Sequence, residues 1–175
     1  ISFGAYFGFF ALYMRDLDYS GQQTGIFIAL GVLAEVGIFL IARRLISQFG
    51  VWNLLFVSIA LTGLRWYVMA AFADTFMVIV LSQLIHALSF GLTHAVSVHF
   101  IHQFLPKAYQ SRGQAVYISI AFGLGGAFGN YMAGQQWQQG TNAYETFVTA
   151  AVFAAIGALS LLLCSRKEME SAKAA

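Results

Sequence analysis

Charge is scarce in this sequence: Asp, Glu, Lys and Arg together make up 9% of its 175 residues. Water-soluble domains carry about 25% charged residues, so a soluble globular fold is excluded. Hydrophobic residues amount to 59%. The composition therefore predicts an integral membrane protein whose main surroundings are the lipid bilayer.

Cysteine and the usual ligand motifs are also missing. The single cysteine, Cys164, excludes an internal disulfide and any CxxC zinc pattern. His99 and His102 are spaced like metal ligands, but no carboxylate or thiol accompanies them. All four histidines lie in one segment, so two facing helices could not hold haem between them. Because no nucleotide-binding motif is present either, we expect no metal, no cofactor and no nucleic-acid partner.

Long apolar segments dominate what is present. A membrane-spanning helix needs about 20 apolar residues, and six segments come near or exceed this length: Ile1–Met14, Gln22–Ala42, Val51–Ala73, Thr75–Leu105, Gly113–Gln136 and Tyr144–Cys164. The first is short, so we expect its helix to lack its start. The short loops make consecutive helices antiparallel neighbours. The sequence predicts an all-α bundle of six transmembrane helices over residues 1–164, followed by a polar, frayed tail at 165–175.

The basic residues predict the orientation of this bundle. Arg15 alone falls on one side of the membrane, whereas seven basic residues fall on the other: Arg43, Arg44, Lys107, Arg112, Arg166, Lys167 and Lys173. Cytoplasmic loops are enriched in Lys and Arg. We therefore expect a cytoplasmic C-terminus.

Ionisable residues inside the apolar segments are the candidate functional groups, because such residues are costly in a membrane. At about 1.5 Å of rise per residue, Arg65 reaches the depth of His86, and Glu35 that of His94. His86, Phe90 and His94 follow an i, i+4, i+8 spacing and share one helix face. The spacing predicts that Glu35, Arg65, His86 and His94 form a buried set near the middle of the membrane.

Two interpretations of this set stay open. A buried ion pair can simply fix helix register, and His86, between Ser82 and Ser89, can serve as an interhelical hydrogen-bonding group. Alternatively, Glu35 or a histidine takes up and releases a proton, since the unperturbed pKa of histidine is about 6.5. Arg65 would then tune that group or meet an anionic substrate. We favour the proton-transfer interpretation.

Glycines concentrate in the fifth segment, in the run GLGGAFGNYMAG. Gly125 and Gly129 have the GxxxG spacing that lets helix backbones approach closely in lipid. The pattern is typical of tight packing, and it also fits a smooth surface on which helices slide during gating.

One block closely resembles a known family, namely the run HALSFGLTHAVSVHFIHQFLPKAYQSRGQAVYISIAFGLGGAFGNYMAGQQW. It is similar to the phenylpropionate-permease-like branch of the major facilitator superfamily, which is related to lactose permease and nucleoside–proton symporters. The loop ARRLISQFG resembles the basic loop between helices eight and nine of that superfamily. The resemblance covers all six segments and implies the C-terminal half of a transporter in a bacterial inner membrane. It further implies two inverted three-helix repeats, about 1–73 and 74–164, and a six-helix N-terminal half as partner.

The resemblance also implies roles for individual residues. Relatives of lactose permease place an acid on helix eight, an arginine on helix nine and a histidine on helix ten. These positions correspond here to Glu35, Arg65 and His94 or His86. In the sugar permease a second acid follows the histidine by one turn, but here Ala95–Val98 contains none. Glu35 is therefore the stronger candidate for the proton carrier.

Together these observations predict half of a proton-coupled symporter, not an enzyme, for a small organic solute such as an aromatic acid. Sugar or nucleoside symport is the alternative. We expect aromatic rings to stack on the solute, and Arg65 or a histidine to meet its carboxylate, in a cavity lined by Tyr6, Phe10, Glu35, His86, Phe90, His94, Tyr117 and Asn130.

A six-helix intramembrane protease is a more remote hypothesis. It needs a nucleophile near a histidine on another helix, and Ser119 is the candidate.

Overall fold

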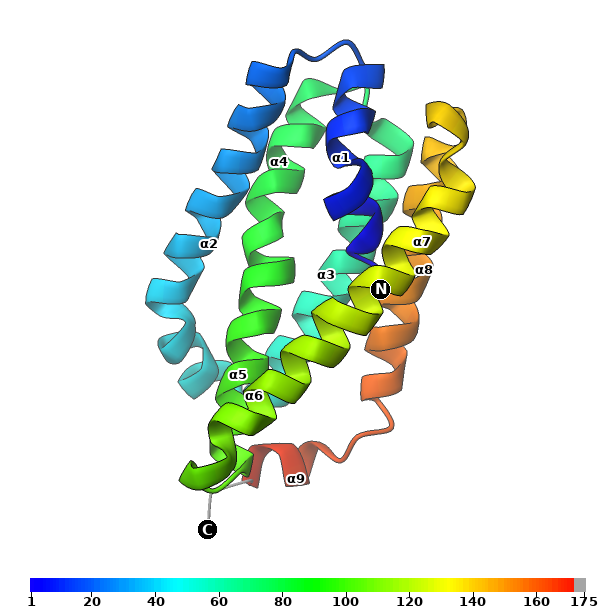
Figure 1. Cartoon of the computed structure of the whole chain (residues 1–175). Coiled ribbons are helices and arrows are strands. Elements are labelled where there is room, and N and C mark those ends of the chain that lie inside the picture. Colours follow the sequence, from blue (N-terminus) through cyan, green and yellow to red (C-terminus); the bar gives the residue numbers. More distant parts are fainter. Residues whose placement is uncertain (172–175) are drawn as a thin grey trace.

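Helices make up almost all of residues 1–171, the part of the chain that the structure, a computed structural model, describes (Figure 1). In chain order they are α1 (Gly4–Asp16), α2 (Gly21–Phe49), α3 (Val51–Phe72), α4 (Phe76–His86), η1 (Ala87–Gly91), α5 (Leu92–Phe104), η2 (Lys107–Tyr109), α6 (Gln110–Ile118), η3 (Ser119–Leu124), α7 (Gly125–Trp137), η4 (Gln138–Gly140), α8 (Ala143–Leu161) and α9 (Arg166–Ser171). The described residues contain no β-strand. The all-α class predicted from the sequence is confirmed.

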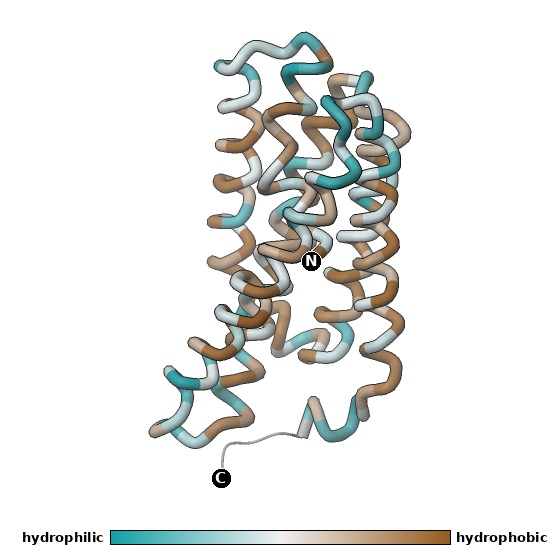
Figure 2. Tube along the Cα trace, turned by 45° about the vertical axis from the view of Figure 1, so that its right-hand side comes forward, coloured by the Kyte–Doolittle hydropathy of each residue, from teal (hydrophilic) through white to brown (hydrophobic). Residues whose placement is uncertain are grey.

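Four helical stretches are long and apolar enough to cross a membrane: Gly21–Phe49, Val51–Phe72, Phe76–Phe104 and Ala143–Leu161. Apolar residues run along these rods, and hydrophilic residues gather toward their ends (Figure 2). The chain is thus a helical membrane protein. That α1 and the α6–η3–α7 rod also cross the membrane stays a prediction.

Two helices extend beyond the predicted segments. α2 passes through Arg43 and Arg44 and ends only at Phe49, because the intervening residues favour helix and the first stop is Gly50 with a φ of 78°. Residues 166–171 of the tail form α9 and are not frayed. The Glu170 carboxylate accepts hydrogen bonds from the backbone N–H groups of Val51 (3.2 Å) and Trp52 (3.0 Å), at the start of α3. The predicted tail residue Lys173 lies outside the described residues.

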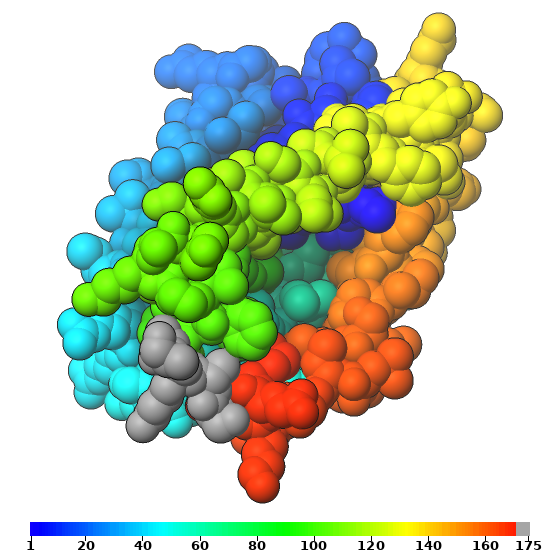
Figure 3. All heavy atoms as spheres, turned by 60° about the horizontal axis from the view of Figure 1, so that its bottom comes forward, coloured from blue at the N-terminus to red at the C-terminus, as the bar shows by residue number. Residues whose placement is uncertain are grey.

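The loops predicted to be cytoplasmic share one end of the bundle. The turn between α2 and α3, the turn between α5 and α6, and α9 lie together at the lower end in Figure 1, which comes forward in Figure 3. Lys107 lies in the turn between α5 and α6, and Arg166 and Lys167 lie in α9, whereas Arg43 and Arg44 belong to the last two turns of α2 and Arg112 to the first turn of α6. This arrangement agrees with the alternating topology expected from the sequence.

Two of the helical rods contain a π-helical turn, which no sequence pattern predicts. η1 joins α4 to α5, and η3 joins α6 to α7, without a break in either rod. The carbonyl group of Ser89 in η1 accepts hydrogen bonds from two hydroxyl groups, those of Thr62 on α3 (3.5 Å) and Thr93 on α5 (2.5 Å). π-Turns of this kind occur frequently at functional sites.

The helices α1 and α7 cross in direct backbone contact. A Cβ atom added to Gly4 would collide with the backbone of Gly129 and Asn130, and one added to Gly8 would collide with the Asn130 side chain. The close approach predicted for the fifth segment therefore holds at Gly129. Gly123 and Gly126 have open space where a side chain would be.

We predict that Gly4→Ala destabilises the bundle, because the added methyl group has only backbone to displace. Overpacking of this kind costs about 1–3 kcal/mol, which should lower the midpoint of thermal unfolding followed by tryptophan fluorescence in detergent. Gly126→Ala on α7 is the matched control and should leave the midpoint unchanged or slightly higher. Equal midpoints for both variants would contradict the crossing.

Candidate functional site

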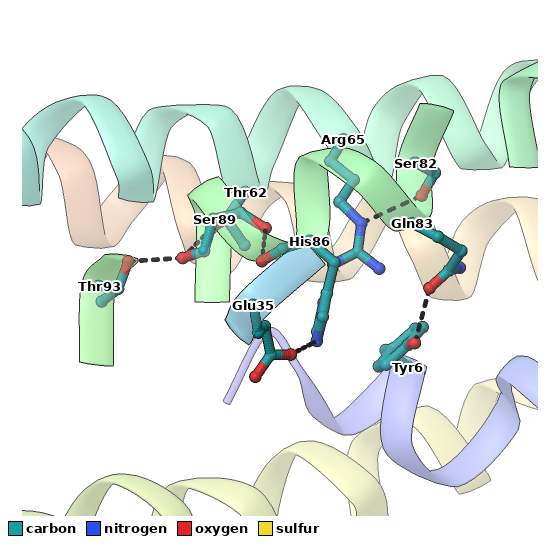
Figure 4. Close-up of polar contacts among 9 residues, drawn as sticks. All are labelled: Tyr6, Glu35, Thr62, Arg65, Ser82, Gln83, His86, Ser89 and Thr93. Atoms are coloured by element: carbon teal, nitrogen blue, oxygen red, sulfur yellow. Dashed lines mark hydrogen bonds and ion pairs between the residues drawn. The ribbon is translucent and has the colours of Figure 1, made fainter. Parts of the chain in front are cut away.

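Three of the predicted polar residues form a continuous chain across helices (Figure 4). His86, at the end of α4, lies between Glu35 on α2 and Arg65 on α3. His86 Nε2 is 2.7 Å from Glu35 Oε1, and His86 Nδ1 is 2.7 Å from Arg65 Nη1. Arg65 and His86 are 2% and 4% exposed, so these bonds lie largely inside the protein.

The geometry selects one tautomer of the His86 ring. A guanidinium group has only N–H donors, so Arg65 Nη1 donates and His86 Nδ1 must accept. His86 therefore carries its proton on Nε2, from which it donates to the Glu35 carboxylate. A second proton could bind His86 only if its bond with Arg65 broke. Of the three groups, Glu35 is the one that can gain a proton while both bonds to His86 persist.

Besides His86, Arg65 is held by one hydrogen bond and two aromatic rings, while its Nη2 atom is buried without a hydrogen-bond partner among the described residues. Its Nε donates to Ser82 Oγ at 3.0 Å, and its Cζ atom lies 4.8 Å from the ring centre of Tyr6 and 4.2 Å from that of Trp66. Cation–π contacts at these distances stabilise a desolvated guanidinium. This arrangement explains how a cation can reside in the apolar interior.

Small residues leave room for the polar chain. A Cβ atom on Gly91 would lie 3.1 Å from Glu35 Cγ, and one on Gly31 would lie 3.1 Å from Gln83 Oε1. Gln83 in turn accepts a hydrogen bond from the Tyr6 hydroxyl at 2.8 Å. The absence of side chains at these two glycines allows α2 to approach α4 and η1 closely enough for Glu35 to reach His86.

Two neighbouring cavities adjoin this chain. The first, about 340 Å³ and here called the Glu35 cavity, is lined by Tyr6, Phe7, Phe10, Ala11, Ile28, Val32, Glu35, His86 and Phe90. The second, about 430 Å³ and here called the aromatic cavity, is lined by Ile1, Phe3, Gly4, Phe7, Phe90, Thr93, His94, Ser97, Tyr117, Ala121, Phe122, Gly126, Ala127 and Asn130. The Glu35 cavity is lined by α1, α2 and the α4–η1 rod, and the aromatic cavity by the N-terminal residues with α1, the η1–α5 rod and the α6–η3–α7 rod.

The structure divides the predicted site residues between these cavities. His94 makes no hydrogen bond with Glu35, Arg65 or His86 in the described structure; its Nδ1 lies 3.3 Å from the Tyr117 hydroxyl. Tyr117, Asn130 and His94 line the aromatic cavity, Tyr6 and Phe10 line the Glu35 cavity, and Phe90 lines both. Arg65 lines neither, because Tyr6 and His86 lie between its guanidinium and the open space.

Several residues of the site were missed in the sequence. Phe3, Phe7 and Phe122 complete an aromatic wall around the second cavity, with ring centres of Phe122 and Phe90 5.7 Å apart. Phenylalanine is so common in this chain that nothing in the sequence distinguishes these three. The i+4 spacing from Phe3 to Phe7 is the only signal that could have placed two of them on one face.

The protease hypothesis is wrong. Ser119 begins η3 and is exposed on the outside of the bundle. It forms no hydrogen bond with a histidine among the described residues, so no base is placed to activate it.

Comparisons with known proteins agree on one family. The model of the MFS_1 like family matches residues 1–149. The chain is 32% identical over 138 residues to a probable 3-phenylpropionic acid transporter of Escherichia coli (strain K12), covering 77% of this chain and 35% of that protein. It is 27% identical over 165 residues to the maltose permease of Geobacillus stearothermophilus, covering 91% of this chain and 40% of that protein. The chain thus spans well under half the length of these relatives. No solved structure matches the chain significantly.

Proposed function

Since the chain belongs to the MFS_1 like family of the major facilitator superfamily, we propose that it is one half of a proton-coupled secondary transporter for a small organic solute. The two curated relatives are more than twice as long as the stretch they share with it, which supports a second, N-terminal six-helix half. Basic residues at one end of the bundle support a cytoplasmic C-terminus and, for a bacterial transporter, residence in the inner membrane.

The solute is an aromatic acid bound in the aromatic cavity. At about 430 Å³, this space has the size of ordinary small-molecule sites. The rings of Phe3, Phe90 and Phe122 would stack on a phenyl group, and His94, Tyr117 and Asn130 offer polar atoms for its carboxylate. The name of the 3-phenylpropionic acid transporter relative agrees with this solute class. The maltose permease relative keeps a sugar as the alternative, and nucleosides would fit the same chemistry.

Glu35 carries the proton. The observation that supports this role is the fixed tautomer of His86, which accepts from Arg65 and donates to Glu35. Glu35 faces the open Glu35 cavity, so a proton has access to its second oxygen. His86 does not gain or lose a proton in this step, and its two hydrogen bonds link Arg65 to the carboxylate.

Repulsion between negative charges couples the proton to an anionic solute. An ionised Glu35 disfavours a carboxylate in the neighbouring aromatic cavity, because charges interact strongly in a medium of low dielectric constant. Protonation of Glu35 removes that repulsion. Each ligand therefore favours binding of the other, and the effect is reciprocal. A neutral sugar would not experience this repulsion.

The test is uptake of labelled 3-phenylpropionate by the complete transporter in proteoliposomes, measured as the initial rate above that of protein-free vesicles. One pH unit, acid outside, makes the external proton concentration about tenfold higher. If uptake is first order in protons, we expect up to about a tenfold rise in this rate. A rate that ignores the gradient would contradict proton coupling. Gradient-driven uptake of maltose in place of 3-phenylpropionate would favour the sugar alternative.

A further inference from the structure

The aromatic cavity and the Glu35 cavity share two lining residues, Phe7 and Phe90. Phe7 is 56% exposed, whereas Phe90 is half-buried within the π-turn η1. The Phe90 ring stacks on His86, with ring centres 5.2 Å apart and planes 5° from parallel. Its edge contacts to Phe3 (5.0 Å) and Phe122 (5.7 Å) face the aromatic cavity. One ring thus touches both the proton-binding chain and the space for the solute.

We propose that Phe90 is the partition between the two cavities and a positioning residue that couples them. Its ring contacts the solute in the aromatic cavity and holds His86 in place by stacking. This inference rests on the proposed function. A phenyl group seated against Phe90 and Phe122 restrains the Phe90 ring, and the stack in turn restrains His86 in the orientation that donates to Glu35. Without a ring at position 90, the two cavities merge and His86 loses its flat support.

The π-turn is what brings Phe90 to this place. It widens the backbone between His86 and Gly91, and the missing side chain of Gly91 admits Glu35 directly beside the turn. The other titratable or charged groups that face Glu35 and His86 are Tyr6 from α1, Arg65 from α3 and His94 from α5. Only Phe90 among the rings in contact with His86 also lines both cavities.

The partition makes three measurable predictions for Phe90→Leu in the complete transporter. Exchange of 3-phenylpropionate at equal pH needs no net proton movement and should fall only a few-fold, because one stacking contact is lost. The response to one unit of pH gradient should fall from about tenfold toward no response. In vesicles without solute, a trapped pH dye should report a faster proton leak, because Glu35 is no longer screened from the aromatic cavity.

Phe122→Leu is the matched control. Phe122 touches Phe90 and lines the aromatic cavity, but it makes no ring contact with His86. This variant should weaken exchange by a similar few-fold factor and keep both the gradient response and the low leak.

The outcomes separate the inference from the proposed function. If wild-type protein shows no gradient-driven uptake, the proposed function fails. If wild-type protein responds and Phe90→Leu responds equally, with an unchanged leak, the partition is overturned while the proposed function stands. Should Phe90→Leu lack exchange altogether, Phe90→Met, an unbranched side chain that also lacks a ring, decides by the same ratio and the same leak measurement.

Discussion

Arg65→Gln should be the most destabilising single substitution in the polar chain. The change removes the donor to His86 Nδ1, the donor to Ser82, and the cation that rests between Tyr6 and Trp66. The Glu35 carboxylate is then left without a nearby cation in the apolar interior. Removing one member of a buried charged set costs about 3–5 kcal/mol. Unfolding of the purified protein in mixed detergent micelles, followed by tryptophan fluorescence, measures this loss.

Arg15→Gln is the control for Arg65→Gln. The Arg15 side chain is 69% exposed and forms an ion pair with its neighbour Asp16, so its replacement should change the unfolding free energy by less than about 0.5 kcal/mol. The double variant Arg65→Gln/Glu35→Gln removes both charges and should recover part of the loss, with an interaction energy of about 1–3 kcal/mol. Additive losses in this cycle would show that Arg65 and Glu35 are independent, contrary to the bridged geometry.

Much of the polar chain could be predicted because buried charges obey simple constraints. A charge in an apolar helix needs partners, and depth along nearly straight rods follows from residue count. These constraints match Arg65 to His86 and place Glu35 in the same buried set, although residue count matches the depth of Glu35 to His94 and the structure pairs Glu35 with His86. The rods themselves, and the all-α class, followed from apolar segments with few interruptions.

The remaining parts of the site depend on irregularities of the helix backbone, which cannot be predicted by counting residues along an ideal helix. His94 shares a helix face with His86 by the i, i+4, i+8 spacing only if the helix between them is an ideal α-helix. The π-turn at Ala87–Gly91 uses i→i+5 hydrogen bonds, so the positions after it are rotated around the axis. His94 accordingly meets Tyr117 and not Glu35.

Packing between segments that are far apart in the sequence could not be predicted either. The role of α9 depends on Glu170 reaching the start of α3, which a polar tail sequence does not indicate. The burial of Arg65 behind Tyr6 and His86 was also unforeseen. It leaves His94, and not Arg65, as the candidate to meet a solute carboxylate in the aromatic cavity.

Glu35→Gln should abolish the response of transport to a pH gradient while solute exchange persists. The glutamine carbonyl can still accept the hydrogen bond from His86 Nε2, so the geometry of the polar chain is retained. The amide cannot bind a proton, however, and it carries no charge to repel a solute carboxylate. The roughly tenfold rise in 3-phenylpropionate uptake expected per pH unit should therefore disappear, whereas exchange at equal pH should stay within a few-fold of wild type.

His94→Gln distinguishes the proton carrier from the group that meets the solute. Because His94 lines the aromatic cavity beside Tyr117, its replacement should weaken 3-phenylpropionate binding in exchange and leave the response to the gradient intact. The reverse pattern, a full response in Glu35→Gln and none in His94→Gln, would transfer the proton to His94. Proton uptake would then occur in the aromatic cavity itself, where the charge of an imidazolium would attract the carboxylate directly, and the polar chain of Glu35, His86 and Arg65 would reduce to a device that fixes helix register.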